Sequence, residues 1–275
     1  MAPKLGIIAG GGDLPGLVAA ACRAQGRPFH ILALSGHADP RVIGDEAPQD
    51  WVRLGEAGTG FERLRRAGVA EVVMIGPVRR PSILELAPDF RTARFFARVG
   101  LKALGDDGLL RAVAAELEGE GFKVVGVDEV LSGCLAIPGP YGNLSPDEQA
   151  GADIARGVQV ARGLGALDVG QAVVVQQGIV LGIEAVEGTD NLLRRCAPLA
   201  REGLGGVLVK MRKPGQDRRI DLPTIGLATL REASAAGLRG IAVEAGGALV
   251  LDRDSMAAEA DRLGLFVVGV ESPQC

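Results

Sequence analysis

The chain has 275 residues and a net charge of −4, and aromatic residues make up only 3% of a sequence that is 47% hydrophobic. An acidic chain with few stacking aromatics is not typical of a nucleic-acid binder, so nucleic acid is excluded as a partner. Four scattered cysteines without CxxC spacing and only two histidines argue against a zinc site or a disulfide framework and favour a reducing cytosol.

The first half alternates short apolar runs with helical patterns. Strands are predicted at Leu5–Ala9, Phe29–Leu34, Trp51–Leu54, Glu71–Ile75 and Lys123–Val127, and helices at Leu14–Gln25, Phe61–Ala67 and Gly108–Glu120. This alternation predicts an α/β fold with a Rossmann-like, doubly wound parallel sheet over residues 1–135. Asp13 is expected to be the N-cap of the first helix, with Pro15 in its first turn.

The second half has a different pattern after a Pro/Gly-rich linker at residues 136–144. Ser145 is expected to cap a helix that ends near Gly163. Two hairpins are predicted, with turns at Gln177-Gly178 and Gly246-Gly247, each followed by a helix. Residues 145–275 are therefore expected to form an α+β catalytic domain with a mixed sheet.

A glycine-rich turn, Gly10-Gly11-Gly12-Asp13, links the first strand to the first helix. Glycine lets a backbone approach an anionic ligand at a helix N-terminus. The turn differs from a dinucleotide fingerprint because Pro15 replaces its third glycine, and because no acidic residue ends the second strand. NAD is thus disfavoured, whereas a nucleotide, a sugar phosphate or a purely steric need for glycine stays open.

Two further loops carry positive charge. Arg79 and Arg80 follow the strand that ends at Ile75, where open α/β sheets bind ligands, although a solvent-facing loop is equally compatible. The loop from Lys210 to Asp221 holds five cationic side chains together with Asp217 and Asp221. Such a loop suits a polyanionic substrate and a hard metal ion, and its alternative interpretation is a solvated loop with surface ion pairs.

Taken in order, six motifs resemble the UDP-2,3-diacylglucosamine pyrophosphatases of the LpxI type: Ile7–Pro15, Gly76–Pro81, Gly105–Asp107, Ile183–Asp190, Lys213–Asp217 and Asp221–Gly226. The resemblance implies metal-assisted hydrolysis of UDP-2,3-diacylglucosamine to UMP and lipid X in lipid A biosynthesis of a Gram-negative bacterium, with water attacking the β phosphorus. It implies Mg²⁺ or another divalent cation as cofactor. It also places the essential acidic residue at Asp221, as metal ligand or general base.

The predicted site follows from these motifs. Asp221 is the expected catalytic residue, and Asp221 and Asp217 are the expected metal ligands. The expected substrate contacts are Gly10, Gly11, Gly12, Asp13, Arg79, Arg80, Thr189, Asp190, Lys210, Lys213, Gln216 and Arg219.

No apolar run is long enough to span a bilayer. We therefore expect a cytoplasmic protein that visits the inner face of the inner membrane for its lipid-linked sugar nucleotide. A homodimer is left open. Two other functions also remain open at this point, namely a non-catalytic nucleotide-sensing module and a nucleotide-dependent oxidoreductase.

Overall fold

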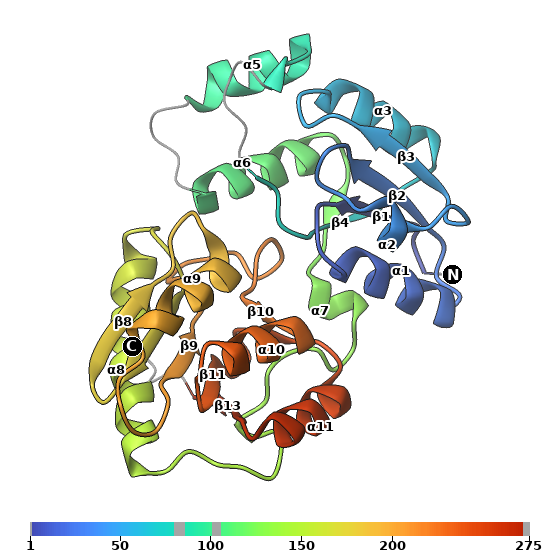
Figure 1. Cartoon of the computed structure of the whole chain (residues 1–275). Helices are drawn as coiled ribbons and strands as arrows, with labels where there is room; N and C mark the ends of the chain where they lie inside the picture. Colours follow the sequence, from blue (N-terminus) through green and yellow to red (C-terminus); the bar gives the residue numbers. More distant parts are fainter. Residues whose placement is uncertain (1, 80–85, 101–105, 272–275) are drawn as a thin grey trace. The chain divides into compact units, whose positions relative to one another are not determined.

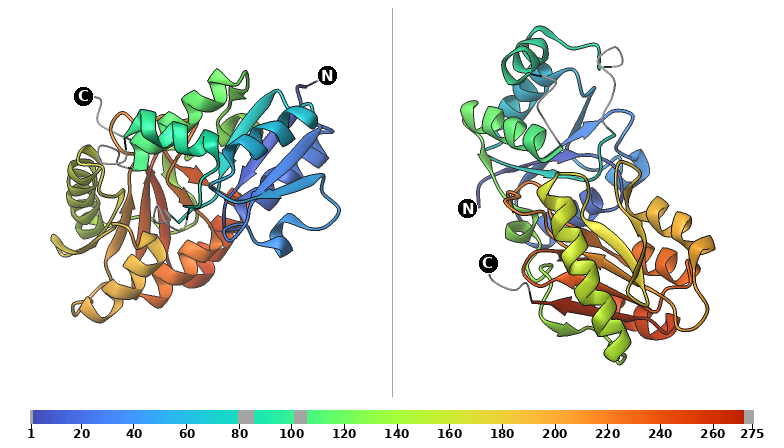
Figure 2. Two further views of the ribbon diagram at one scale, coloured as in Figure 1. Left: turned by 90° about the horizontal axis from the view of Figure 1, so that it is seen from above. Right: turned by 90° about the vertical axis from the view of Figure 1, so that its left-hand side faces the viewer.

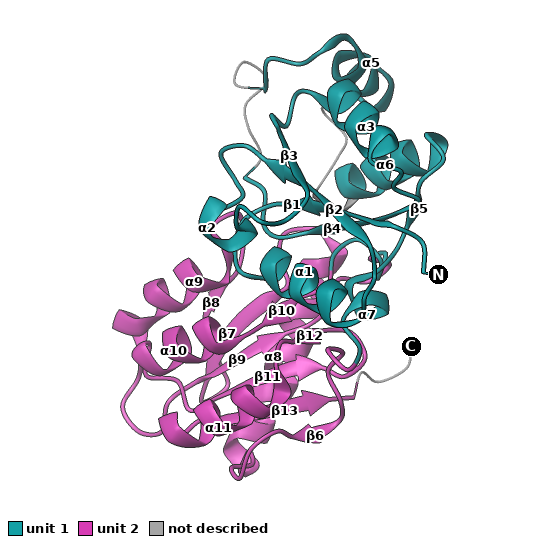
Figure 3. Cartoon of the chain, turned by 90° about the vertical axis from the view of Figure 1, so that its right-hand side faces the viewer, with its two compact units in different colours: residues 1–132, 217–221 teal, residues 133–216, 222–275 magenta. Residues whose placement is uncertain are grey.

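The computed structural model describes residues 2–79, 86–100 and 106–271. The chain divides into two compact units, of which unit 1 holds Met1–Ser132 and Asp217–Asp221, and unit 2 holds Gly133–Gln216 and Leu222–Cys275 (Figure 3). A short piece of the second half of the sequence therefore belongs to the first unit. That piece carries both carboxylates predicted to bind metal.

Unit 1 is built on a five-stranded sheet in the order β3-β2-β1-β4-β5 (Figure 1). Its strands are β1 (Leu5–Ala9), β2 (Phe29–Leu34), β3 (Gln49–Val52), β4 (Glu71–Ile75) and β5 (Lys123–Val124). Every neighbouring pair is parallel. This is the strand order of a dinucleotide-type α/β half, so the predicted Rossmann-like sheet is confirmed.

Helices flank this sheet, as a parallel sheet requires. The helices of unit 1 are α1 (Leu14–Ala24), α2 (Pro40–Ile43), α3 (Ala57–Arg66), α5 (Phe90–Val99), α6 (Asp106–Gly119) and α7 (Val127–Val130). Among them, α5 packs on α3. Phe61 and Leu64 of α3 and Leu117 of α6 pack with side chains from β2, β4 and β5 in one apolar cluster. Ile220, from the short returning piece of chain, is buried in the same cluster.

Unit 2 contains a six-stranded mixed sheet in the order β6-β13-β11-β9-β7-β8, with a separate two-stranded sheet of β10 and β12. The strands are β6 (Gly139–Pro140), β7 (Ala172–Gln176), β8 (Ile179–Ile183), β9 (Val207–Lys210), β10 (Thr224–Ile225), β11 (Gly240–Glu244), β12 (Leu249–Val250) and β13 (Phe266–Val270). The three strands β9, β11 and β13 are parallel, whereas β7 runs antiparallel to β9 and to β8. The mixed sheet predicted for the second half is confirmed.

Helices pack on both faces of the mixed sheet (Figures 1 and 2). They are α8 (Glu148–Ala166), α9 (Gly188–Cys196), α10 (Leu227–Ala235) and α11 (Arg253–Leu263), with a 3-10 turn at Ala197–Leu199. The long helix α8 covers one face, where Ile154 and Ala161 meet Val173 and Val209. Helices α9, α10 and α11 supply the apolar cluster on the other face.

Two local predictions for the second half are wrong. Helix α8 starts at Glu148 rather than at Ser145, because the carboxylate of Asp147 accepts the Ala150 N–H at 2.8 Å and so provides the N-cap. The turn at Gly246-Gly247 does not join a hairpin, because β11 pairs in parallel with β9 and β13 while β12 pairs with β10. The hairpin turn at Gln177-Gly178 is confirmed, since β7 and β8 pair antiparallel across it.

The five residues of β11 are all buried, so this strand lies inside the sheet. A strand buried on both faces lacks the alternation of apolar and polar residues seen in a solvent-facing hairpin. Its apolar run therefore does not show which strands pair with it.

Candidate active site

In unit 1 the glycine turn packs against the loop that follows β4. The Gly11 N–H donates to the Pro77 carbonyl at 2.9 Å, and the Gly10 N–H donates to the Ile75 carbonyl at 2.8 Å. A Cβ on Gly10 would lie 2.5 Å from the Gly76 carbonyl oxygen. Gly76 itself has φ +87°, a left-handed conformation that favours glycine. Gly10 and Gly76 are thus required by the close approach of two loops at the carboxyl ends of β1 and β4.

His37 joins the same edge of the sheet. The backbone N–H of Arg79 donates to His37 Nδ1 at 3.3 Å, which links the loop after β2 to the loop after β4. Partial burial lowers the pKa of His37, and the nearby positive charge of Arg79 lowers it further. The imidazole is therefore neutral at neutral pH. Asp13 is the N-cap residue of α1 by position, but its exposed carboxylate makes no capping hydrogen bond.

The segment Asp217–Asp221 is held in unit 1 by charge and by burial. Arg219 binds both carboxylate oxygens of Asp217, at 3.1 and 2.7 Å, and donates to Glu118 of α6 at 2.7 Å. Hydrogen bonds from Arg219 lower the pKa of Asp217 although burial opposes them. Ile220 is only 8% exposed, so the chain is anchored directly beside Asp221, which is half-buried.

In unit 2 a second group of polar side chains lies at one edge of the mixed sheet. Strands β9 and β11 end there with Lys210 and Glu244, and β8 ends one residue before Glu184. All three charged side chains are buried, with exposures of 6% for Lys210, 8% for Glu244 and 6% for Glu184. Lysine and glutamate side chains are almost never fully buried unless they are paired, so the partners of these three side chains indicate what this edge of the sheet can bind.

The lysine of this group has an unusual environment. Lys210 Nζ donates to the Thr224 carbonyl at 3.0 Å, and among the residues that the structure describes no carboxylate lies within ion-pair distance of it. An ammonium group has three donors and loses several kcal/mol of solvation on burial. Thr224 is two residues before Gly226, the N-cap of α10, whose N-terminus adds partial positive charge. The surroundings of Lys210 thus favour a bound anion.

The two buried carboxylates organise the loops around this lysine. Glu184 accepts the Thr189 hydroxyl at 2.6 Å and the Gln171 N–H at 3.2 Å, which ties the first turn of α9 to the start of β7. Glu244 accepts the Arg212 N–H at 2.9 Å. Both carboxylates therefore hold backbone in place at the edge that carries Lys210.

In the rest of the basic loop in unit 2, Lys213 and Gln216 have polar partners. Lys213 pairs with Asp168 at 2.6 Å, and its backbone N–H donates to the side chain of the buried Gln216 at 3.1 Å. Asp190 is exposed in the first turn of α9. Helix α9 begins at Gly188 after Glu187, and the Thr189 hydroxyl binds Glu184.

Comparison with known proteins places both halves of the chain in one family. The model of the LpxI N-terminal domain matches residues 4–134, and that of the LpxI C-terminal domain matches residues 138–268. The chain belongs to the LpxI family. It is also 46% identical over 275 residues to the UDP-2,3-diacylglucosamine pyrophosphatase LpxI of Caulobacter vibrioides (strain ATCC 19089 / CIP 103742 / CB 15), covering 98% of each protein. The family predicted from the ordered motifs is confirmed.

In this LpxI-family chain the predicted site residues are distributed over the two units. Unit 1 holds Gly10, Gly11, Gly12, Asp13, Arg79, Asp217, Arg219 and Asp221, and unit 2 holds Thr189, Asp190, Lys210, Lys213 and Gln216. Arg80 lies outside the described residues, as do the side chains of Asp106 and Asp107. The roles of all these residues remain predictions.

The carboxylates of the Asp217–Asp221 segment differ in their fitness for a divalent metal. In this conformation Asp217 does not fit, because Arg219 occupies both of its oxygens. Within the described part of the chain, no three histidine, cysteine or acidic residues gather as a metal site would require. A Mg²⁺ ion often uses only one or two carboxylates together with substrate phosphates. The role of Asp221 as a metal ligand therefore stays a prediction.

Three residues that contact the loop from Lys210 to Asp221 were not predicted from the sequence, namely Asp168, Glu118 and Glu244. Glu244 had a usable signal, since it ends an otherwise apolar strand where α/β sheets present functional side chains. Asp168 and Glu118 had none, because their partners Lys213 and Arg219 are 45 and 101 residues away in sequence.

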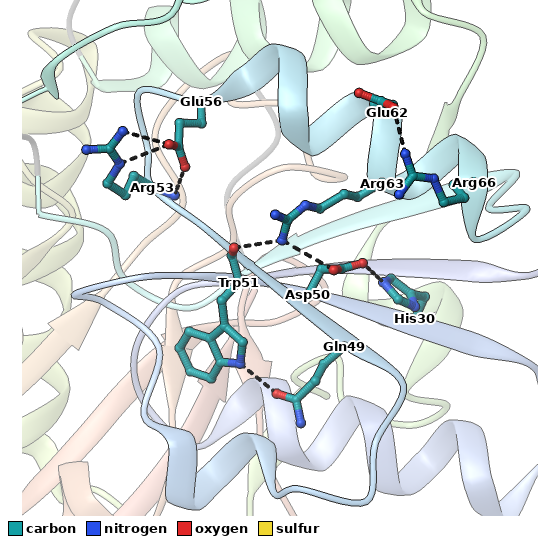
Figure 4. A network of polar contacts seen from close by, with 9 residues as sticks. All are labelled: His30, Gln49, Asp50, Trp51, Arg53, Glu56, Glu62, Arg63 and Arg66. Carbon is teal, nitrogen blue, oxygen red and sulfur yellow. Dashed lines mark hydrogen bonds and ion pairs between the residues drawn. The ribbon is translucent and has the colours of Figure 1, made fainter.

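His30 belongs to a different network, which Figure 4 shows from close by. Its Nε2 lies 3.0 Å from Asp50, whose other oxygen accepts from Arg63 at 3.2 Å, and Arg63 also donates to the Trp51 carbonyl at 2.9 Å. His30 is the second residue of β2, so it lies toward the opposite edge from the glycine turn. This network joins β2, β3 and α3 and has a structural role.

Among the described residues, no helix is long and apolar enough to cross a membrane.

Proposed function

We propose that this chain hydrolyses the pyrophosphate of UDP-2,3-diacylglucosamine to UMP and lipid X, a step of lipid A biosynthesis. The observation that carries the proposal is the 46% identity to a UDP-2,3-diacylglucosamine pyrophosphatase over 98% of both chains. Fold alone would not support it, because α/β sheets of this kind host many unrelated activities.

The charge distribution in unit 2 supports a pyrophosphate substrate. Hydrolysis of a phosphoanhydride needs fixed positive charge near the non-bridging oxygens. Lys210 offers a buried ammonium without a carboxylate partner among the described residues, next to the N-terminus of α10. Lys213 is already paired with Asp168, so substrate would have to compete for it. Lys210 is therefore the cation we assign to the pyrophosphate.

In unit 1, Arg79 and Asp221 are the residues that we propose for the chemistry. Arg79 is exposed beside the glycine turn, where its guanidinium can bind a phosphate. Asp221 is assigned to the attacking water, which it would orient or deprotonate toward the β phosphorus. Arg219 holds Asp217 and Glu118 and, with the buried Ile220, fixes the backbone next to Asp221.

A divalent cation such as Mg²⁺ would neutralise pyrophosphate charge when bound, with Asp221 as the proposed protein ligand. Chelation is therefore expected to abolish turnover, and readdition of Mg²⁺ to restore it. Full turnover in excess chelator would remove the metal from the proposal while leaving the hydrolysis intact.

We further propose that the protein works on the cytoplasmic face of the inner membrane without spanning it, because its substrate is a diacylated lipid. The aromatic content is low, so aliphatic side chains must meet the acyl chains. Reaction in labelled water tests the regiochemistry: the heavy oxygen is expected in lipid X, and label in UMP would refute attack at the β phosphorus. A nucleotide-sensing module would bind without turnover, and an oxidoreductase would leave the anhydride uncut.

A further inference from the structure

We propose that the outer face of α5, formed by Phe90, Ala93, Arg94 and Ala97, docks unit 1 on an anionic lipid bilayer. Residues spaced by three or four positions lie on one side of a helix. Phe90 is 85% exposed, and Ala93, Arg94 and Ala97 are exposed with it. The proposal rests on the proposed function in one respect, namely that the substrate is a membrane lipid.

The first turn of α5 is fixed to α3 by polar contacts. The Asp89 carboxylate accepts the Gly58 N–H at 2.9 Å and the Thr92 N–H at 2.7 Å. The Thr92 hydroxyl oxygen accepts the Ala57 N–H at 3.1 Å, and Thr92 is buried. The contacts with Gly58 and Ala57 join the start of α5 to the start of α3, and the contact with the Thr92 N–H caps α5 itself. The orientation of α5 about its own axis is therefore set by the protein.

A second set of contacts joins α5 to the end of α6. Arg91 pairs with Glu120, which directly follows α6, and Arg98 pairs with Glu116 within that helix. Phe95 is buried on the same inner side, with an exposure of 9%. With its inner side occupied in this way, α5 has no freedom to turn Phe90 inward.

The exposure of Phe90 has no explanation in the folding of unit 1, because its ring contributes almost no buried area. An exposed aromatic ring beside arginines on a surface helix is typical of helices that lie in a membrane interface. Ala93 and Ala97 are small enough to let the helix approach the headgroups closely.

Local charge favours an anionic surface. The sequence of α5 contains Arg91, Arg94 and Arg98 and no acidic residue. Glu120 pairs with both Arg65 and Arg91, Arg98 pairs with Glu116, and Arg94 has no ion pair among the described residues. With the Asp89 carboxylate at the start of the helix included, these side chains carry four positive and three negative charges, a net charge of +1. Because the whole chain carries −4, attraction to an anionic bilayer must come from a local patch of this kind.

The position of α5 in unit 1 also fits lipid entry. The N-terminus of α3 follows the carboxyl end of β3, so the first turn of α5, which contacts it, lies at the carboxyl edge of the parallel sheet. The glycine turn lies at the same edge of that sheet. The proposed bilayer contact and the glycine turn thus share one edge of unit 1.

Cosedimentation with vesicles of phosphatidylglycerol and phosphatidylethanolamine tests the proposal. The full chain is expected to bind them, and Phe90→Ser is expected to lower the partition coefficient roughly tenfold. Arg94→Gln is expected to lower it roughly fivefold, and only when phosphatidylglycerol is present. Leu204→Ser and Arg156→Gln are matched controls, because these side chains are exposed on unit 2, and both are expected to bind as the unchanged chain does.

Equal binding by Phe90→Ser and the unchanged chain would overturn the proposal, and so would a chain that does not bind these vesicles. Turnover of substrate dispersed in detergent is expected to be the same for Phe90→Ser and the unchanged chain, because Phe90 is outside the proposed site. If the unchanged chain binds vesicles but shows no turnover in detergent, the proposed function fails and the docking surface stands.

Discussion

Replacement of Lys210 by methionine separates a substrate-binding role from a structural one, because the two roles predict opposite changes in stability. Methionine keeps the length of the side chain and removes its charge. Burial of an ammonium costs several kcal/mol, roughly 4, and a hydrogen bond from a charged group to a carbonyl returns about 2 kcal/mol. Lys210 has one such bond, to Thr224, so the free protein carries a net cost of about 2 kcal/mol at this position.

Lys210→Met removes that cost but leaves the Thr224 carbonyl without its donor, which costs about 1 kcal/mol. The free protein should therefore become more stable by about 1 kcal/mol, while turnover falls at least roughly 100-fold because the pyrophosphate loses its buried cation. Urea unfolding measures the first effect, and release of UMP measures the second.

The control is Lys213→Met, which breaks an ion pair with Asp168 and should destabilise the protein slightly. A Lys210→Met variant that is less stable by about 2 kcal/mol or more and keeps its turnover would contradict the substrate-binding role, because Lys210 would then be a structural residue.

The remaining predictions concern the short returning segment and the glycine turn. Asp221→Ala should lower turnover by roughly 100-fold or more and leave substrate affinity largely unchanged, whereas Asp217→Ala should lower turnover less. A larger loss of turnover in Asp217→Ala than in Asp221→Ala would show that Asp217 is the catalytic carboxylate. Because Asp217 has a lowered pKa in the folded protein, its contribution to stability is present above the ordinary value of 3.8 and is lost as the pH falls through the lower folded value. Asp217→Asn should therefore flatten the acid side of the stability curve measured by urea unfolding. Gly10→Ala would place a Cβ 2.5 Å from a carbonyl oxygen and should lower the free energy of unfolding by about 1–3 kcal/mol. Gly151→Ala, in open space on α8, should raise it by about 0.5–1 kcal/mol. Thermal unfolding distinguishes these two variants, and equal shifts in Tm would contradict the steric argument.

Much of unit 1 could be predicted from the sequence because its strands are short, buried apolar runs between clear breaks. Strands β2 and β4 have the predicted bounds, Phe29–Leu34 and Glu71–Ile75. Helix α5 was not predicted, since Phe90–Val99 alternates arginine, alanine and phenylalanine, and long-range polar contacts to α3 and α6 fix its position. Such contacts leave no local signal.

The candidate site was predictable only in part, and for a related reason. Charge clustering directed attention to the loop from Lys210 to Asp221, and the role of this loop stays a prediction. The sequence could not predict that this loop is divided between two units, which depends on the burial of Ile220 among side chains more than 90 residues away. Nor could it predict that Lys210 is buried with no carboxylate within ion-pair distance in the part of the chain that the structure describes, because that depends on where Asp168, Glu184 and Glu244 point in the folded protein.

Incubation of the purified chain with UDP-2,3-diacylglucosamine and Mg²⁺, followed by mass spectrometry of the products, shows whether the chain hydrolyses the pyrophosphate. We expect UMP and 2,3-diacylglucosamine 1-phosphate in equal amounts, and no UDP. Intact substrate, or UDP released together with free diacylglucosamine, would contradict this expectation, because neither result involves hydrolysis of the pyrophosphate.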